Sequence, residues 1–371
     1  MNLLINASNV HHVGGAAQVV DSICRELVNF KQHRFYVVFS DKFKKTADAI
    51  SDYKNTEVIF YAYPPKDLFA ALTKRNKFLD EMVVANHIDC VLTVFGPSKW
   101  VPKCPHISGF AIPHLLFPES HFFKDLNFSQ RIKMCFFVAK VKYFLKRSAD
   151  VLFTENILCS EILKELFPKK QIYTVTNYFN QVFEQPDKWE EISLPRYDGT
   201  TILCISSLLP HKNIHFCLEV ARVMKCLFPH FKFRFVLTVG EKEFGEVPDE
   251  LKELFFFTGS LHITQVPSLY IQSDIVIQPS LLECFSATYP EAMRMERPLV
   301  VPNLKFAKGL CDNAAIYYDP LSSSEAAEKI YAISTNEELR QKMIENGRLQ
   351  LGKYDTSEQR AKKLIKLCES I

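Results

Sequence analysis

Two glutamates, Glu283 and Glu291, stand in a stretch whose residue types suit binding of a ligand with both phosphate and hydroxyl groups. An ionised carboxylate only accepts hydrogen bonds, so it can hold two neighbouring hydroxyls of a ribose or a sugar. Successive backbone N–H groups at the start of a helix can hold an anionic phosphate. The spacing therefore predicts a site for a ligand that carries both groups, as a nucleotide-sugar does.

This stretch is expected to join a strand to a helix. Ile275–Ile277 is a short β-branched run typical of a buried parallel strand. Residues 287–296 predict a helix that tolerates Pro290 in its first turn. Glu283 is thus expected at the carboxyl end of a strand and Glu291 near a helix start, where α/β sheets bind ligands. The alternative is that both glutamates are solvated and that Glu291 merely suits the helix dipole.

The two glutamates, with Pro290 before Glu291 and Ala292 and Met293 after it, resemble the Glu-x7-Glu signature of a known enzyme family. That family is the retaining, nucleotide-sugar-dependent glycosyltransferases of family 4, or glycosyl transferases group 1. The resemblance implies the GT-B fold, an α/β architecture in which two Rossmann-like domains with parallel sheets face each other across a cleft. It also implies that Glu283 holds the donor sugar and that Glu291 holds the ribose hydroxyls.

The residues after Glu283 depart from the family pattern. The family usually reads Glu-Gly-Phe-Gly where this chain has Glu283, Cys284, Phe285 and Ser286. The resemblance assigns this segment to the donor phosphates. The side chains of Cys284 and Ser286 are expected to narrow the room for phosphate while leaving the backbone N–H donors in place.

A second donor segment is predicted around Lys212, between a strand-like run at 202–205 and a helix. A lysine at a helix start is unfavourable beside the helix dipole unless an anion lies there, so Lys212 is expected to bind an anion. The alternative is that Lys212 is simply exposed to solvent. In the resembled family a lysine here binds the donor diphosphate and an arginine accompanies it. Ser207 and His211 occupy the two places where that arginine is expected. The phosphate clamp is therefore predicted to be weaker or pH-dependent, because histidine titrates near neutrality.

The resemblance implies three further contacts. Gly14 and Gly15, in the loop 11–15, are expected to face the donor phosphates and the acceptor; the alternative is a tight turn. His114 best matches a family histidine that contacts the donor sugar, and a purely structural histidine is the alternative. Gly259 lies in a segment that resembles the one whose backbone reads the nucleotide base.

The composition of the 371 residues favours two domains of ordinary size. A net charge of +3 argues against nucleic-acid binding driven by bulk charge. The chain has no run of eighteen apolar residues and no basic leader, so neither a membrane-spanning helix nor a signal peptide is expected. The eleven cysteines are scattered and include no Cys-x-x-Cys pair, so we expect them to be reduced core residues. The sequence contains no Asp-x-Asp motif, so a metal site of that kind is not expected.

Strand-like runs alternate with helical patterns along the chain, which is typical of parallel α/β architecture. We expect an N-terminal acceptor-side domain over 1–178, a linker over 179–199 and a nucleotide-sugar-binding domain over 200–355. The resemblance implies that a final helix at 356–371 crosses back to the first domain. Capping boxes are predicted at Ser322, Thr335 and Thr356, each followed three residues later by Glu or Gln.

Residues 122–147 are rich in basic and aromatic side chains and contain a single acid, Asp125. A helix of this kind can lie on an anionic membrane, which would suit an enzyme with a lipid-linked acceptor. The other interpretation is an ordinary amphipathic helix whose aromatics face the core and whose lysines are solvated.

The sequence thus predicts a retaining hexosyltransferase that uses a nucleotide-sugar donor, a glycan or lipid-linked glycan acceptor, and neither a cofactor nor a metal. It is expected to act in cell-surface polysaccharide assembly, in the cytoplasm or at the inner face of the membrane. Two alternatives stay open. One is a sugar-nucleotide epimerase or a phosphorylase of the same fold; the other is a catalytically degenerate partner in glycan assembly, which the departures at Ser207, Cys284 and Ser286 favour.

Overall fold

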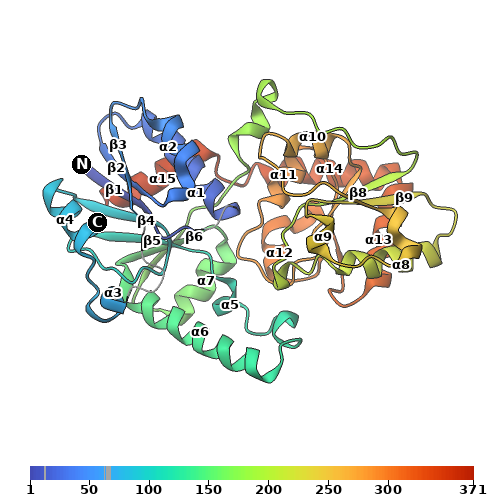
Figure 1. The fold of residues 1–371 in the computed structure, drawn as a ribbon, viewed down its shortest axis with the longest axis horizontal. Helices are drawn as coiled ribbons and strands as arrows, with labels where there is room; N and C mark the ends of the chain where they lie inside the picture. Colours follow the sequence, from blue (N-terminus) through green and yellow to red (C-terminus); the bar gives the residue numbers. More distant parts are fainter. Residues whose placement is uncertain (12–13, 62, 64–67) are drawn as a thin grey trace. The chain divides into compact units, whose positions relative to one another are not determined.

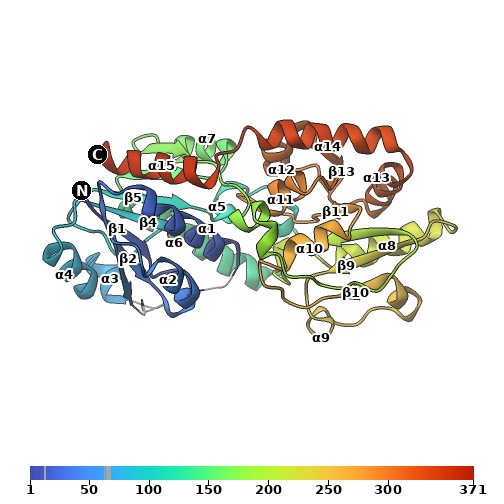
Figure 2. The same cartoon turned by 90° about the horizontal axis from the view of Figure 1, so that it is seen from above.

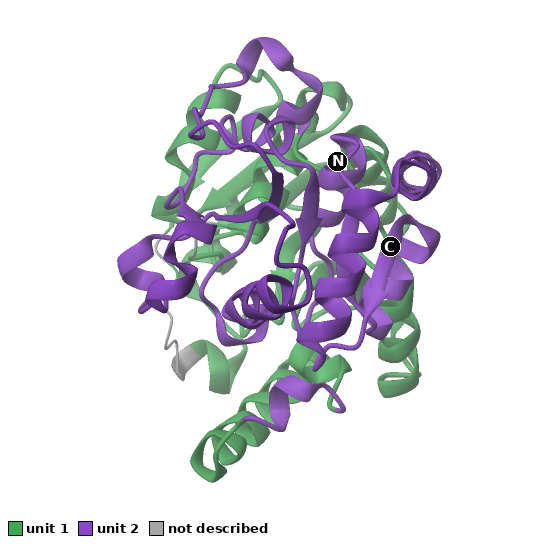
Figure 3. Cartoon of the chain, turned by 90° about the vertical axis from the view of Figure 1, so that its right-hand side faces the viewer, with its two compact units in different colours: residues 1–118, 126–180, 355–371 green, residues 119–125, 181–354 purple. Residues whose placement is uncertain are grey.

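The computed structural model describes residues 1–11, 14–61, 63 and 68–371. His12 and Val13, part of the predicted glycine loop, lie outside the described residues. The chain forms two compact units, shown in Figure 3. Unit 1 comprises residues 1–118, 126–180 and 355–371, and unit 2 comprises residues 119–125 and 181–354.

Unit 1 is built on a parallel sheet whose described strands follow the order β3-β2-β1-β4-β5-β6-β7 (Figure 1). The strands are β1 (Asn2–Ala7), β2 (Arg34–Phe39), β3 (Thr56–Phe60), β4 (Cys90–Gly96), β5 (His106–Phe110), β6 (Val151–Thr154) and β7 (Gln171–Thr174). The helices are α1 (Gly15–Arg25), α2 (Lys44–Ile50), α3 (Leu68–Thr73), α4 (Lys77–Ala85), α5 (Pro113–Leu116), α6 (Phe128–Ser148), α7 (Ile157–Leu166) and α15 (Ser357–Glu369).

The central strand β1 of unit 1 is buried on both faces. Leu3 and Ile5 belong to one apolar cluster, whereas Leu4 between them belongs to another on the opposite face. This follows from the alternation of side chains along a strand, and it explains why the strand reads as a continuous apolar run.

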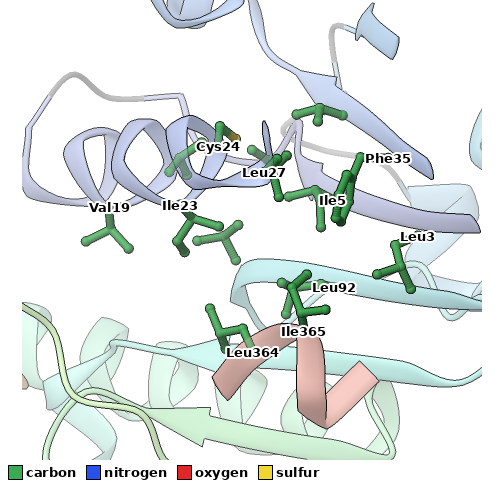
Figure 4. Close-up of a cluster of buried hydrophobic side chains, with 14 of the residues drawn as sticks. Leu3, Ile5, Val19, Ile23, Cys24, Leu27, Phe35, Leu92, Leu364 and Ile365 are labelled. Carbon is green, nitrogen blue, oxygen red and sulfur yellow. The ribbon is translucent and has the colours of Figure 1, made fainter. Parts of the chain in front are cut away.

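The C-terminal helix α15 completes the core of unit 1. Leu364 and Ile365 are buried in the cluster that includes Leu92 of β4 and Ile23 of α1, as Figure 4 shows and Figure 2 places in the fold. Thr356 caps the helix reciprocally with Gln359, as predicted. The final helix therefore packs with N-terminal elements although it follows unit 2 in sequence.

Unit 2 contains a second parallel sheet in the order β10-β9-β8-β11-β12-β13. Its strands are β8 (Thr200–Cys204), β9 (Phe233–Leu237), β10 (Phe255–Phe257), β11 (Ile275–Ile277), β12 (Leu299–Pro302) and β13 (Ala315–Tyr318). Its helices are α8 (Phe216–Leu227), α9 (Glu241–Phe244), α10 (Val266–Ile271), α11 (Thr288–Arg294), α12 (Lys305–Cys311), α13 (Ser323–Thr335) and α14 (Glu337–Leu351). The α/β class is thus confirmed in both units.

The unit boundaries differ from the predicted domain boundaries in two places. Residues 181–199 of the predicted linker lie with unit 2, and part of this segment is packed: Phe183 is fully buried and Trp189 Nε1 donates to the Val182 carbonyl at 2.7 Å. Residues 119–125, predicted in the first domain, lie with unit 2, where Ser120 Oγ donates to the Leu281 carbonyl at 2.7 Å. Neither contact has a signature in the local sequence.

The helix-start predictions at Ser322 and Thr335 need correction. Ser322 does cap α13 by accepting from the Glu325 N–H, but the Glu325 carboxylate accepts from the Asp319 N–H instead of completing the box. Thr335 is the last residue of α13, and Asn336 caps α14 in its place. Within the described ranges, every helix is too short or too polar to cross a bilayer.

We expect Leu364→Ala to destabilise the protein by about 2–5 kcal/mol, because it removes a fully buried side chain and leaves a cavity in the core of unit 1. Urea-induced unfolding would measure the loss. Lys362→Ala, an exposed change in the same helix, is the matched control. Equal stability of the two variants would contradict the packing described for α15.

Candidate functional site

The predicted donor segments come from neighbouring strands of unit 2. β8 and β11 pair in parallel, with Ile202 opposite Ile275 and Leu203 opposite Val276. The chain continues from β8 to β9 on one side, whereas β11 continues to β12 on the other. This is a topological switch point, where the loops at the carboxyl ends of the strands diverge and leave a crevice for ligands.

Lys212 lies in the loop after β8, although not at the start of a long helix as predicted. It ends a short 3₁₀ turn, Pro210–Lys212, and Asn213 follows in the left-handed conformation with φ 53°. The helix α8 begins only at Phe216. Lys212 is therefore not at the N-terminus of α8, because residues 213–215 separate it from the helix.

The Lys212 ammonium contacts the Glu283 carboxylate directly, donating from Nζ to Oε1. Glu283 is buried, with 8% of its side chain exposed, and the Lys212 side chain is 21% exposed. A carboxylate removed from water requires a partner, and Lys212 provides it. An anion was predicted beside Lys212, and in this structure that anion is the carboxylate of Glu283, the residue predicted to hold the donor sugar.

Backbone contacts hold the two loops together. The Leu281 N–H donates to the His211 carbonyl at 2.8 Å. The Leu281 carbonyl in turn accepts from Ser120 Oγ. His211 is half-buried and stands edge-on to the Phe122 ring, with 6.2 Å between centroids. Ser207, the other position where arginine was expected, is exposed. The loop that carries Glu283 is therefore fixed on both sides just before the glutamate.

Glu291 is buried in the first turn of α11, at 4% exposure, and accepts a hydrogen bond of 2.9 Å from the Tyr270 hydroxyl of α10. Burial raises the pKa of the Glu291 carboxyl to about 7, and the Tyr270 hydrogen bond opposes that rise. The pKa of Tyr270 is raised by its own burial and by the nearby carboxylate. A carboxylate that Tyr270 satisfies only at Oε2 can still accept hydrogen bonds from a ligand.

The residues that replace the family's glycines turn into the unit. Cys284 and Ser286 are buried, and Ser286 Oγ accepts from Gln278 Nε2 at 3.2 Å. Phe285 between them is half-buried and stands edge-on to Tyr354. The expected narrowing of the phosphate site is therefore not apparent at Ser286, whose hydroxyl is engaged with an interior glutamine.

Gly259, after β10, adopts φ 72°, a conformation that favours glycine. Its N–H donates to the Val239 carbonyl at 3.2 Å, and its carbonyl accepts from the Thr258 hydroxyl at 3.0 Å. Backbone recognition of a base at this residue would therefore depend on the second lone pair of its carbonyl.

The other predicted residues belong to unit 1. Gly14 and Gly15 lead into α1, and a Cβ built on either one meets no heavy atom within 4 Å. That open space is compatible with close approach of a ligand. His114 lies in α5 after β5, edge-on to Phe137 of α6 at 5.7 Å. Burial lowers the pKa of His114, so its imidazole is neutral near pH 7.

Sequence reasoning missed Tyr270, Gln278 and Ser120. Tyr270 lies in an apolar helical segment and reads as a core residue, and nothing local indicates that it faces Glu291. Gln278 contacts Ser286 from the buried side of the site loop. Ser120 contacts Leu281 of the same loop from far away in the sequence. Among the described residues, no three His, Cys, Asp or Glu side chains form a group that could hold a metal.

A family model matches the part of the chain that contains this site. Residues 185–350 match the family model described as glycosyl transferases group 1, a span that contains Lys212, Glu283, Glu291 and Tyr270. No curated protein matches the chain by sequence.

Several solved structures share the fold along nearly the whole chain. A glycosyltransferase from Rickettsia africae is 15% identical with a TM-score of 0.72, covering 99% of this chain and 97% of that one. Alr3699/HepE from Anabaena, in complex with UDP-glucose, is 15% identical with a TM-score of 0.69 and full coverage of both chains. WaaG, a glycosyltransferase involved in lipopolysaccharide biosynthesis, is 12% identical with a TM-score of 0.69 and full coverage of both. The chain therefore has the predicted GT-B fold, and its residues 185–350 match glycosyl transferases group 1.

Proposed function

We propose that this protein transfers a hexose from a nucleotide-sugar to a hydroxyl of a glycan or lipid-linked glycan, with retention at the anomeric carbon. The observation that carries the proposal is the contact of Lys212 with Glu283 at the β8–β11 switch point, with the buried Glu291 in the helix α11 that follows the same loop. It combines one cation for a diphosphate with two buried carboxylates for hydroxyl groups.

The proposed mechanism relies on positioning and on charge. Glu291 accepts hydrogen bonds from the ribose hydroxyls, and Glu283 accepts them from the donor sugar. Lys212 stabilises the negative charge that develops on the departing diphosphate. Because Lys212 contacts Glu283 directly, binding of the diphosphate brings a second anion to the same ammonium. No cofactor or metal is assigned a step, since Lys212 supplies the positive charge.

The named neighbours support the donor and the biological setting of the proposal. HepE was solved with UDP-glucose, and WaaG acts in lipopolysaccharide biosynthesis. By analogy we propose a UDP-hexose donor and a role in cell-surface polysaccharide assembly, with the protein in the cytoplasm or at the inner face of the membrane. The roles of His114, Gly14 and Gly15 in donor or acceptor binding stay predictions of the sequence.

Nucleotide binding can be tested by thermal unfolding of the purified chain with UDP, GDP, ADP or CMP. We expect one nucleotide, at a hundred times its dissociation constant, to add about 2.7 kcal/mol of stability. Glu291→Ala should abolish that gain because the ribose hydroxyls lose their acceptor, whereas Glu253→Ala, at an exposed glutamate of unit 2, should retain it. A gain that survives in Glu291→Ala would place the nucleotide elsewhere.

Glu283→Gln should reduce turnover by about a hundredfold while nucleotide affinity is kept, because the lost charge acts on the reacting sugar. The measurement is the release of free nucleotide from the nucleotide-sugar in the presence of an acceptor glycan. Glu253→Gln is the control. Release that needs no acceptor would favour an epimerase or phosphorylase, and full activity of Glu283→Gln would refute the assigned role.

Nucleotide affinity should depend on the ionisation of Glu291. With a pKa of about 7, the carboxyl is mostly protonated at pH 6 and mostly ionised at pH 8, so binding should be about tenfold weaker at pH 6. Tyr270→Phe removes the hydrogen bond that opposes the rise in pKa, so the midpoint should move to higher pH.

Calorimetric titration with the nucleotide across this pH range would measure both effects. Glu291→Gln reports the titration of the nucleotide's own phosphate and serves as the baseline. Tyr289→Phe is the matched tyrosine control, since its hydroxyl is buried without a hydrogen-bond partner in the described structure. A pH profile shared by wild type and Glu291→Gln would show that Glu291 does not bind the nucleotide.

A further inference from the structure

The helix α6 (Phe128–Ser148) is the long helix of unit 1 that Figure 1 labels. Four of its exposed large apolar side chains lie along one side of the helix. Phe128 is 80% exposed, Phe136 73%, Tyr143 48% and Ile132 42%. We call these four residues the apolar ridge. Their exposure is contrary to the interpretation in which the aromatics of this segment face the core.

The ridge and the buried face lie on opposite sides of α6. Residues of an α-helix are turned by about 100° from one to the next, so spacings of four, four and seven residues keep the ridge within about 80° of the circumference. The buried residues Val141, Leu145 and Ser148 fall about 180° away from its centre. The last two turns of the helix are therefore held to unit 1 by the face opposite the ridge, whereas its first half is exposed on most sides and presents Phe128, Ile132 and Phe136 outward.

Basic side chains flank the ridge on both sides. By the same geometry Lys133, Lys140 and Arg147 project beside one edge, and Arg131, Lys142 and Lys146 beside the other. The Arg147 guanidinium stacks over the Tyr143 ring at 4.7 Å from its centroid. Residues 128–148 contain six basic residues and no acid, whereas the net charge of the whole chain is +3, so the rest of the chain is acidic on balance.

We infer that α6 lies flat on an anionic lipid bilayer, with the ridge inserted at the level of the headgroups and the six basic residues paired with lipid phosphates. An apolar stripe between two rows of cations matches the layered chemistry of a bilayer interface, in which apolar chains lie beneath anionic headgroups. The lysine stems can bury their methylene groups while their ammonium groups reach the phosphates. A protein partner with both an apolar groove and two acidic rims would be a more specialised match.

Only the helix itself forms this surface, although the sequence pattern began at residue 122. Phe122 is buried in unit 2 against Phe123 and His211, so it belongs to the packing near the site loop. Phe137 of α6 is turned toward His114. The docking surface is therefore the ridge with its six basic neighbours. It deepens the proposed function, because a lipid-linked acceptor would be presented at the same bilayer.

Flotation of the full-length protein with vesicles tests the inference. The protein should float with vesicles of phosphatidylcholine and phosphatidylglycerol, but not with phosphatidylcholine alone, and added salt should weaken binding. Each basic residue near an anionic surface is worth about fivefold in partitioning, so combining Lys133→Gln, Lys140→Gln and Lys142→Gln should weaken binding about a hundredfold. The control combines Lys31→Gln, Lys44→Gln and Lys54→Gln, which removes the same charge from exposed positions elsewhere in unit 1.

The apolar ridge is tested separately. Phe128→Ala with Phe136→Ala should weaken partitioning at least about tenfold, because two exposed rings lose their insertion into the interface. Phe60→Ala with Leu72→Ala, at exposed apolar positions outside α6, should have no effect. All variants should keep their unfolding temperature, since the replaced side chains lie outside the core.

The outcomes separate this inference from the proposed function. Equal binding to neutral vesicles, no binding to either kind, or equal binding by the α6 variants and their controls would overturn the docking surface. Stabilisation by a nucleotide without flotation would leave the transferase proposal in place and reject only the docking surface. Flotation through α6 without stabilisation by any nucleotide would do the reverse.

Discussion

The parallel pairing of β8 with β11 is the constraint on which the candidate site depends. Because the chain leaves these two strands in opposite directions along the sheet, their loops diverge at the carboxyl edge. Lys212 and Glu283 are far apart in sequence, yet each follows one of these strands, and they meet as an ion pair. The backbone bond from Leu281 to His211 keeps the two loops in register.

Burial of charge at this edge has a consequence for the chemistry. Glu283 is paired with the Lys212 ammonium, whereas Glu291 has the hydroxyl of Tyr270, and burial raises the pKa of Glu291 to about 7. Two carboxylates of the same motif thus have different environments and suit different tasks. Unit 1 contains a comparable buried carboxyl, Glu155, whose pKa is also raised to about 7 by burial and is lowered in part by Arg360 of α15.

The helix α6 both packs against unit 1 and exposes large apolar side chains. Val141 and Leu145 hold it to unit 1, while Phe128 and Phe136 on the opposite side stay in water at a cost in solvation. Such exposure is unfavourable for an isolated protein and becomes favourable if the rings enter a lipid interface. When the protein is not on a membrane, the six basic residues of α6 keep this region of the surface hydrated.

The sequence by itself determined the elements and the motif. Apolar runs with β-branched residues located β11 and, to within two residues, β8, and the capping box at Thr356 located the last helix, because these signals are local. Glu283, Glu291 and Lys212 were identified from residue type and spacing. Only the tertiary structure decided that Lys212 contacts Glu283, that Tyr270 satisfies Glu291, that Ser286 turns inward and that the ridge of α6 is exposed. The reason is physical: each of these depends on which strands pair and which helix face is covered, and contacts between residues distant in sequence leave no periodic signal in either segment.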